Sequence, residues 1–119
     1  MIDTVILVET RLYDADLGFN GKPDLITILK GDKLPSLLDL KTGQAQQNWW
    51  VLQDSAYRHL AKKDKGIICY RGLSIRPKKD GSGCLIDEHP RDYKRAFNIF
   101  LGLLNAHRFF NNEKEVKTQ

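Results

Sequence analysis

Two aspartates and one lysine interrupt segments that otherwise read as buried strands. Asp24 precedes one short apolar run, and Asp39 and Lys41 lie at the end of the next run. If the turn between these strands is centred near Gly31, antiparallel pairing places residues whose numbers sum to about 63 opposite one another, which pairs Asp24 with Asp39. Directly opposed Cβ atoms lie ~4.5–5.5 Å apart, and like charges there are destabilising unless something compensates them. We therefore predict that the two carboxylates hold a cation.

The chemistry of these three side chains suits a hard divalent metal ion. Mg²⁺ prefers oxygen donors and is usually held by one or two carboxylates plus substrate phosphate, and Mn²⁺ is its natural substitute. Strand alternation puts Lys41 on the same face as Asp39, where its charge can orient a water molecule or stabilise charge on a phosphate. The trio predicts metal-dependent hydrolysis of a phosphodiester. The alternative is that Asp24 caps a turn after Pro23 and that Asp39 pairs with Lys41 at the surface.

Hydrophobic periodicity and turn residues predict the elements that position these side chains. Runs rich in apolar and β-branched residues indicate strands, and apolar residues at helical spacing indicate two helices. The order βββαββα predicts a mixed α/β fold, in which a three-stranded antiparallel meander carries the site. The strands are expected at 5–13, 25–29, 37–40, 66–75 and 84–87, one helix from about Gln46 to Lys63, and a closing helix over Tyr93, Phe97, Phe100, Leu101 and Leu104.

Length and composition place limits on the class of protein. The chain has 119 residues, which suits a single domain at 1–119 with a frayed tail at 111–119. No apolar run approaches the ~20 residues that span a bilayer, and the first residues lack the pattern of a signal peptide. The formal charge of +4 is compatible with a polyanionic partner. We therefore expect a cytoplasmic protein of a bacterial or phage-infected host cell, with no membrane partner.

The spacing of the acidic residues resembles a nuclease signature. Pro23-Asp24, fourteen intervening residues and Asp39-Leu40-Lys41 resemble the motif of the PD-(D/E)xK nuclease superfamily. The resemblance covers roughly Glu9 to Leu60 and is closest to RecB-type nucleases, a branch that includes the mitochondrial genome maintenance exonucleases. The matching segments are Gly21-Lys22-Pro23-Asp24 for G-x-x-D, Asp39-Leu40-Lys41-Thr42-Gly43 for D-x-K-T, and Gln53 with Tyr57 for Q-x-x-x-Y. The resemblance implies a minimal restriction-endonuclease-like core.

The same resemblance implies a role for each residue of the metal site. Asp24 and Asp39 would bind the metal ion, Leu40 would contribute its backbone carbonyl, and Lys41 would be the catalytic lysine. Glu9 occupies the place where many relatives carry a further acid, and it would lie opposite Asp24 if the first turn is centred near residues 16 and 17. The implied cofactor is Mg²⁺ or Mn²⁺.

Further residues could support the site or contact nucleic acid. Gln53 and Tyr57 share one helical face and would support the site, although Gln53 could instead face solvent and Tyr57 could be an ordinary core aromatic. Trp49 falls on the apolar stripe and is expected in the core, whereas Trp50 lies off the stripe and could either pack in the core or stack on an unpaired base. The basic residues that could contact phosphates are Lys62, Lys63, Lys65, Arg71, Arg76, Lys78, Lys79, Arg91, Lys94 and Arg95.

The implied function is a metal-dependent DNA nuclease, and we expect an exonuclease that acts on DNA ends or single strands in replication or recombination. Many relatives carry a helix before the first strand; here that helix would come from a homo-oligomer or from a partner protein. Some relatives hold an iron–sulfur cluster with four cysteines, and the two cysteines here predict none. The alternatives are a Holliday-junction-resolvase-like homodimeric endonuclease and a nuclease-derived DNA-binding subunit of a larger complex.

Overall fold

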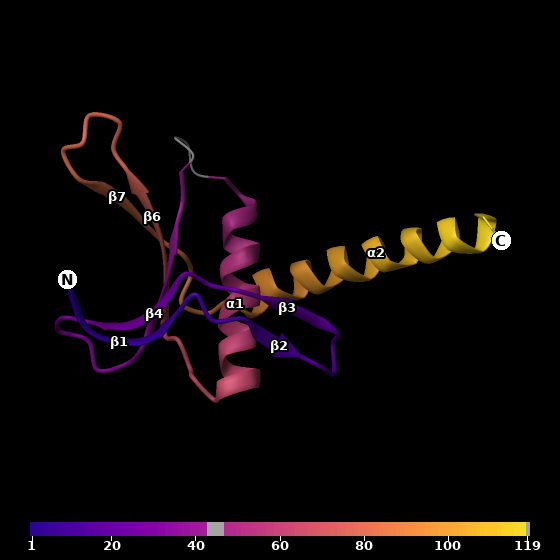
Figure 1. Ribbon diagram of the computed structural model, residues 1–119, viewed down its shortest axis with the longest axis horizontal. Coiled ribbons are helices and arrows are strands. Elements are labelled where there is room, and N and C mark those ends of the chain that lie inside the picture. The colour runs from indigo at the N-terminus through magenta and orange to yellow at the C-terminus, as the bar shows by residue number, and fades with distance from the viewer. Residues whose placement is uncertain (43–46, 119) are drawn as a thin grey trace.

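The computed structural model describes residues 1–42 and 47–118, with side chains through Asn111. Gly43 of the D-x-K-T segment and Gln46, the expected start of the first helix, lie outside the described residues. The elements, shown in Figure 1, are β1 (Ile2–Val8), β2 (Leu12–Asp14), β3 (Phe19–Gly21), β4 (Leu25–Leu29), β5 (Ser36–Leu40), α1 (Trp49–Lys65), β6 (Arg71–Pro77), β7 (Cys84–Glu88) and α2 (Lys94–Thr118).

The fold is mixed α/β, as the sequence predicts. A five-stranded sheet has the order β1-β4-β5-β6-β7, and a separate two-stranded sheet pairs β2 with β3. Every neighbouring pair of strands is antiparallel except β5 and β6, which are parallel. Parallel neighbours need a crossover connection, and α1 provides it across one face of the sheet. This crossover brings the residues of α1 over the end of β5.

The first predicted strand is wrong in its extent. It was expected to run without interruption through 5–13, but β1 ends at Val8 and Glu9 has a left-handed φ of 43°. This turn redirects the chain out of the main sheet and into the β2–β3 hairpin, whose Leu12 side chain is fully buried against α1. The element order is therefore βββββαββα, not βββαββα. The β2–β3 hairpin is inserted in the chain between β1 and β4, which are nevertheless neighbours in the sheet.

Helix α1 has a well-defined C-terminus. Gly66 adopts a left-handed φ of 67°, and its amide donates to the carbonyl of Lys62 while the amide of Ile67 donates to that of Ala61. This arrangement satisfies the last carbonyls of the helix, and glycine adopts the required conformation without a Cβ clash. The predicted strand at 66–75 is consequently shortened at its start, because residues 66–70 form the connection to β6.

The closing helix is longer than its apolar pattern indicates. Helix α2 packs its first half beside α1 and then extends away from the rest of the molecule (Figure 1). Phe97 and Phe100 anchor it by stacking near Phe19 of the hairpin and His59 of α1. The backbone is helical through Thr118, and the fraying of residues 111–119 in solution stays a prediction.

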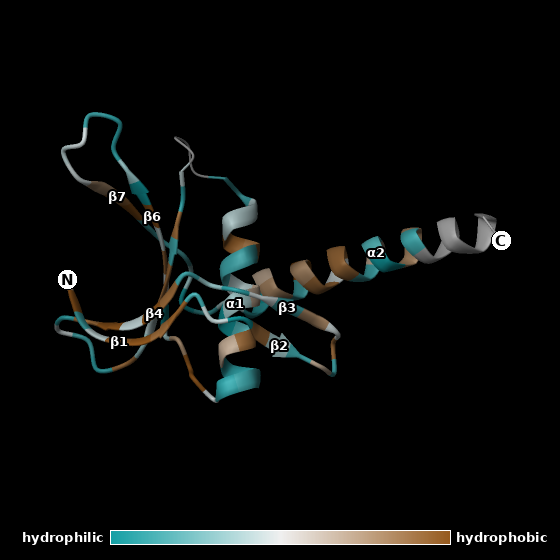
Figure 2. Ribbon diagram, viewed as in Figure 1, coloured by the Kyte–Doolittle hydropathy of each residue, from teal (hydrophilic) through white to brown (hydrophobic). Residues whose placement is uncertain are grey.

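The sheet has an apolar cluster on each face. Between the sheet and α1, the cluster contains Ile26, Leu37 and Leu60. On the opposite face Leu38 packs with Leu29 and Leu73, and the strand residues around this second cluster, including Val5, Leu40 and Ile86, are exposed. Figure 2 shows the apolar colouring of β1 and β4. None of the helices in the part of the chain that is described has the length and hydrophobicity to cross a membrane.

Candidate active site

The pairing of β4 with β5 brings the two aspartates together. Leu25 pairs with Leu38 and Ile26 with Leu37, so the residue numbers of each pair sum to 63 as the sequence predicts. Extending this register by one step places Asp24 beside Asp39. The Leu40 amide donates a hydrogen bond of 2.8 Å to Asp24 Oδ2, which fixes the Asp24 carboxylate across the strand ends.

The environment of the two carboxyl groups disfavours two adjacent negative charges. Burial raises the pKa of the Asp39 carboxyl group, and a hydrogen bond with Asp24 raises that pKa further. The nearby Lys41 ammonium opposes both effects but leaves the pKa of Asp39 above its usual value. The ionised form of Asp39 is therefore disfavoured relative to a free carboxylate, and a cation bound between the two groups would favour it.

Lys41 lies between the sheet and the start of α1. Its backbone amide donates to the carbonyl of Ile75 on β6, which holds the chain in line with the sheet immediately after β5. The ammonium Nζ is 2.5 Å from Asp39 Oδ2 and also donates to Gln53 Oε1. It lies 5.0 and 5.5 Å from the ring centroids of Trp49 and Trp50, and the residue is only 9% exposed. The ion pair of Asp39 and Lys41, which the alternative places at the surface, is therefore buried, and its ammonium also hydrogen-bonds to Gln53.

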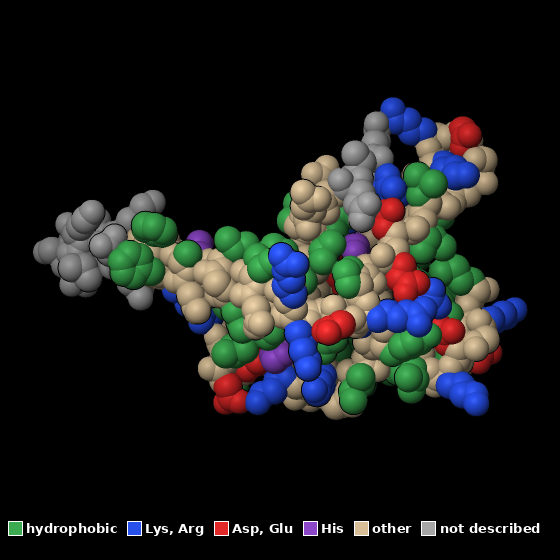
Figure 3. Space-filling view, turned by 180° about the vertical axis from the view of Figure 1, so that it is seen from behind, with side chains coloured by type: hydrophobic (Ala, Val, Ile, Leu, Met, Phe, Trp, Pro, Cys, Tyr) green, Lys and Arg blue, Asp and Glu red, His purple; other side chains and the backbone are tan. Residues whose placement is uncertain are grey.

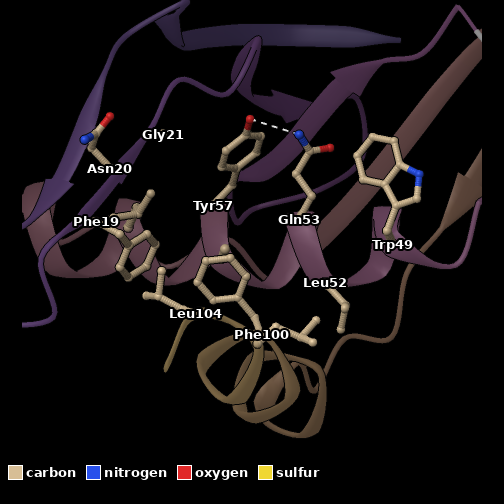
Figure 4. Close-up of a pocket in the computed structure, with 12 residues that line it drawn as sticks. Phe19, Asn20, Gly21, Trp49, Leu52, Gln53, Tyr57, Phe100 and Leu104 are labelled. Carbon is tan, nitrogen blue, oxygen red and sulfur yellow. Dashed lines mark hydrogen bonds between the residues drawn. The ribbon is translucent and has the colours of Figure 1, made fainter. Parts of the chain in front are cut away.

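Gln53 and Tyr57 extend this network along α1. Gln53 Nε2 donates a hydrogen bond of 3.1 Å to Tyr57 Oη, and Figure 4 shows the two side chains pointing toward each other from successive turns of the helix. This bond orients the Gln53 amide so that its oxygen faces Lys41. Burial and the charge of Asp39 raise the pKa of the Tyr57 phenol, so the phenol stays protonated at neutral pH.

Gly21 has a steric role in this network. A Cβ atom built on Gly21 would lie 2.6 Å from Tyr57 Cε1 and 3.2 Å from Leu60 Cδ1, which is too close for the aromatic ring in its observed position. The glycine of the G-x-x-D segment therefore gives room to the tyrosine of the Q-x-x-x-Y segment.

We expect Gly21→Ala to displace the Tyr57 ring and to weaken the hydrogen bond to Gln53. Overpacking of this kind typically costs ~1–3 kcal/mol of stability. Urea denaturation of the variant should show this loss, and Gly21→Ala should cost much less when it is made in a Tyr57→Ala background, because the clash with the ring is gone. Gly81, which has open space at its Cβ position but a φ of 74°, controls for backbone strain alone when it is changed to alanine. Additive losses in the double variant would contradict the steric role.

The two tryptophans have different environments, and that of Trp49 differs from the prediction. Trp50 is 3% exposed and packs near Lys41 and Arg76, whereas Trp49 is 53% exposed. The side of α1 that faces the sheet carries Trp50, Asp54 and Arg58. Trp49 is the first residue of the helix, and its apolar stripe lies beside this sheet-facing side. The expectation of a buried Trp49 is therefore wrong, and of the two alternatives for Trp50 the structure has core packing. Trp49 is the aromatic side chain that is exposed beside the site.

Glu9 lies next to the site through its backbone. Its amide donates to the carbonyl of Asp24, and the last two pairs of β1 with β4, Leu7 with Ile26 and Val8 with Leu25, have residue numbers that sum to 33, as those of Glu9 and Asp24 do. The cleft around the carboxylates has a volume of about 420 Å³ and is lined by Asp24, Asp39 and Lys41 among others, but not by Glu9. The structure does not bring the Glu9 carboxylate into the cleft, and its role as a metal ligand stays a prediction.

The donor set fits a hard divalent ion that keeps several water molecules. Asp24 and Asp39 supply carboxylate oxygens from adjacent strand ends, and the pKa of Asp39 is raised by burial and by Asp24 despite the ion pair with Lys41. Within residues 1–42 and 47–118, no three or more side chains of His, Cys, Asp or Glu cluster as metal ligands. Leu40 contacts Asp24 through its amide, and the predicted contribution of its carbonyl stays a prediction.

A buried acid beneath the site was missed by the sequence analysis. Asp54 is 5% exposed, lies 3.4 Å from Arg58 Nη1, and interacts electrostatically with Asp39 and Lys41. A Cβ at Gly72 would lie 2.0 Å from Asp54 Oδ1, so only glycine leaves room for the carboxylate. The i,i+4 pair of Asp54 and Arg58 was visible in the sequence, but such pairs usually lie on exposed helix faces.

Burial raises the pKa of Asp54 to about 6 from the ordinary value of 3.8. Between about pH 4 and pH 6 the native state therefore binds more protons than the unfolded state, and this group lowers the free energy of unfolding as the pH rises. The change corresponds to about 3 kcal/mol at ~1.4 kcal/mol per pKa unit. Asp54→Asn lacks this titration. The free energy of unfolding of Asp54→Asn minus that of the parent should therefore rise by this amount between pH 4 and pH 7. Urea denaturation at each pH measures it, and parallel pH profiles would contradict the assignment.

The basic residues divide into paired and exposed groups. Arg71 bonds to Asp32 and Glu88, and Arg91 also bonds to Glu88, so these side chains stabilise the β6–β7 region. Lys78 is exposed at the tip of the β6–β7 hairpin, where Figure 3 shows Lys and Arg side chains projecting from the molecule. The tip is the part of the predicted phosphate-binding surface that projects furthest from the sheet.

A comparison with models of known protein families and a search of characterised proteins both found no match to this chain.

Proposed function

We propose that this protein is a metal-dependent DNA nuclease that hydrolyses phosphodiester bonds. The observation that carries the proposal is a continuous polar network that runs from Tyr57 through Gln53 and Lys41 to Asp39 and Asp24. The network joins two apposed carboxylates to one buried ammonium at the edge of an open cleft. The resemblance of the same residues to the PD-(D/E)xK motif supports this reading.

The residues of the network have separable tasks in the proposed reaction. Asp24 and Asp39 would hold Mg²⁺ or Mn²⁺, which when bound supplies Lewis-acid stabilisation of the negative charge on the phosphate. Lys41 would orient the attacking water or a phosphate oxygen and stabilise charge that develops in the transition state. Gln53 and Tyr57 fix the position of the ammonium, so that the charge is placed before the substrate arrives.

The proposed substrate is a DNA end or a single strand, as in the exonucleases that the motif resembles. A homodimeric junction-resolving endonuclease with the same metal core is the alternative. Three substrates distinguish these two classes of nuclease: a linear single strand, a circular single strand of the same sequence, and a four-way junction. Degradation that is confined to linear strands supports an exonuclease, whereas symmetrical cuts in the junction support the alternative.

We expect purified protein to lose activity in excess chelator and to regain it with Mg²⁺ or Mn²⁺ but not with Ca²⁺. Ca²⁺ accepts more ligands in a looser geometry and therefore orients the reacting groups poorly. The measurement is the rate of degradation of end-labelled DNA after each metal is added back. Full activity in chelator would contradict metal-dependent hydrolysis at this site.

The exposed apolar face of the sheet supports a further part of the proposal. Val5, Leu40 and Ile86 lie on the face opposite α1 and are at least about half exposed. We propose that a second copy of the chain or a partner protein covers this face. Sedimentation of the purified chain distinguishes a homo-oligomer from a chain that needs a different partner.

A further inference from the structure

A second hollow lies next to the carboxylate cleft, between α1, α2 and the β2–β3 hairpin (Figure 4). Its volume is about 440 Å³, which falls within the usual range of ligand pockets. Figure 4 shows the aromatic rings of Tyr57 and Phe100 facing the hollow from the two helices, with Phe19 nearby on the hairpin. This hollow, which we call the aromatic pocket, is separate from the residues that bear the carboxylates.

The walls of the aromatic pocket include large apolar side chains that the fold leaves uncovered. Trp49 on α1 is 53% exposed and Leu103 on α2 is 58% exposed, although both line the same hollow. Exposed aromatic surface of this kind is a platform on which an unpaired base can stack, because every base presents a flat face.

The aromatic pocket adjoins the carboxylate cleft. Trp49, Gln53 and Tyr57 line both hollows, so a ligand can extend from one into the other along α1. The charges near the two hollows match a nucleic acid strand. Lys22 lines the carboxylate cleft, and Arg11 donates a hydrogen bond to Asn20 Oδ1 at the rim of the aromatic pocket.

We propose that the aromatic pocket binds one unpaired base of the DNA strand whose neighbouring phosphate lies at Asp24 and Asp39. The inference rests on the proposed function and deepens it, because it assigns a binding site to the base next to the reacting phosphate and requires that base to be unpaired. A base within a duplex has both faces covered by its neighbours and cannot enter the pocket without being unstacked. The pocket therefore selects single strands and frayed ends over intact duplex.

The test measures binding in Ca²⁺, with a single strand that carries 2-aminopurine at its terminal nucleotide and a matched strand that is abasic there. Leu103→Glu places a negative charge in the aromatic pocket, and Phe110→Glu places the same charge on a similarly exposed apolar residue ~10 Å further along α2. We expect Leu103→Glu to weaken binding of the intact strand at least about tenfold, and Phe110→Glu to change it less than about twofold. The probe fluorescence should be quenched by the parent and by Phe110→Glu only.

The abasic strand completes the design. The parent should bind it at least about tenfold more weakly than the intact strand, and Leu103→Glu should then cause little further loss, because both changes remove the same contact. Equal binding of intact and abasic strands, or equal effects of the two variants, would overturn the pocket assignment. A dimer of the parent that Leu103→Glu dissociates would also overturn it, since a second copy of the chain would then fill the pocket.

A cleavage assay with the same proteins keeps the two proposals distinguishable. If the parent cuts DNA in Mn²⁺ but Leu103→Glu binds and cuts normally, the base pocket is wrong and the nuclease proposal stands. If the parent binds DNA with pocket-dependent quenching but never cuts it, the proposed hydrolysis is wrong and the base-binding site stands. If the parent neither binds nor cuts DNA, both are wrong.

Discussion

Replacement of Asp39 by asparagine should reduce single-turnover DNA cleavage by at least ~10³-fold. The change keeps the size of the side chain but removes one of two carboxylates that would hold the metal ion, and that ion supplies several kcal/mol of transition-state stabilisation. The apo protein should unfold at the same or a slightly higher urea concentration, because Asp39 is held with a raised pKa beside Asp24. The rate is measured with saturating enzyme and end-labelled DNA in Mg²⁺ or Mn²⁺.

Asp87→Asn provides the matched control for this variant. Asp87 is also a partly buried strand carboxylate in an ion pair, with Arg76, but it lies on β7 and does not line the cleft. Its replacement should lower the free energy of unfolding and leave the single-turnover cleavage rate within a few-fold of that of the parent. Equal rate losses in both variants, or a large loss of apo stability in Asp39→Asn, would identify Asp39 as a structural hydrogen-bonding group.

The second large effect is expected at Lys41. Lys41→Ala should lower the single-turnover rate by ~10²–10³-fold, since it removes one preorganised charged donor from the site. Lys41→Arg should be nearly as harmful. The ammonium is enclosed by Asp39, Gln53 and the two tryptophan rings, and a larger planar guanidinium does not fit the same position.

DNA affinity in Ca²⁺ should change little in either Lys41 variant, because other cationic side chains would contact the phosphate backbone. Lys78→Ala at the exposed hairpin tip is the reciprocal control. It should weaken DNA binding and reduce the salt dependence of binding, while the cleavage rate of bound DNA stays unchanged. Retention of most of the activity in Lys41→Arg would show that the lysine only neutralises the carboxylates. Near-normal cleavage by Lys41→Ala would remove its catalytic role.

The parts of the fold that the sequence predicted are those that short-range pattern determines. The β4–β5 register follows from a short connection between two apolar runs, so the pairing of Leu25 with Leu38 and the approach of Asp24 to Asp39 were predictable. The break after Val8 was not predictable from the apolar pattern. It depends on a left-handed Glu9 and on the burial of Leu12 against α1, which is a long-range contact.

The environment around Lys41 shows why the rest could not be predicted. The helical period groups Trp49 with the apolar residues of α1 but does not fix which side of the helix faces the sheet. In the structure that side buries Trp50 and the charged pair of Asp54 and Arg58. Arg58 is stabilised there by backbone carbonyls, including those of Cys69 and Tyr70, and these acceptors come together only when the connection after α1 is folded.

The central claim is that Asp24, Asp39 and Lys41 form a metal-dependent site that cuts DNA. The measurement that tests it most directly is single-turnover degradation of a labelled single strand by the parent and by Asp39→Asn, prepared in parallel, with Mn²⁺ and with excess chelator. We predict rapid cleavage only by the parent with Mn²⁺. Cleavage by Asp39→Asn at the parent rate, or no cleavage by the folded parent with Mg²⁺ or Mn²⁺, would contradict the claim.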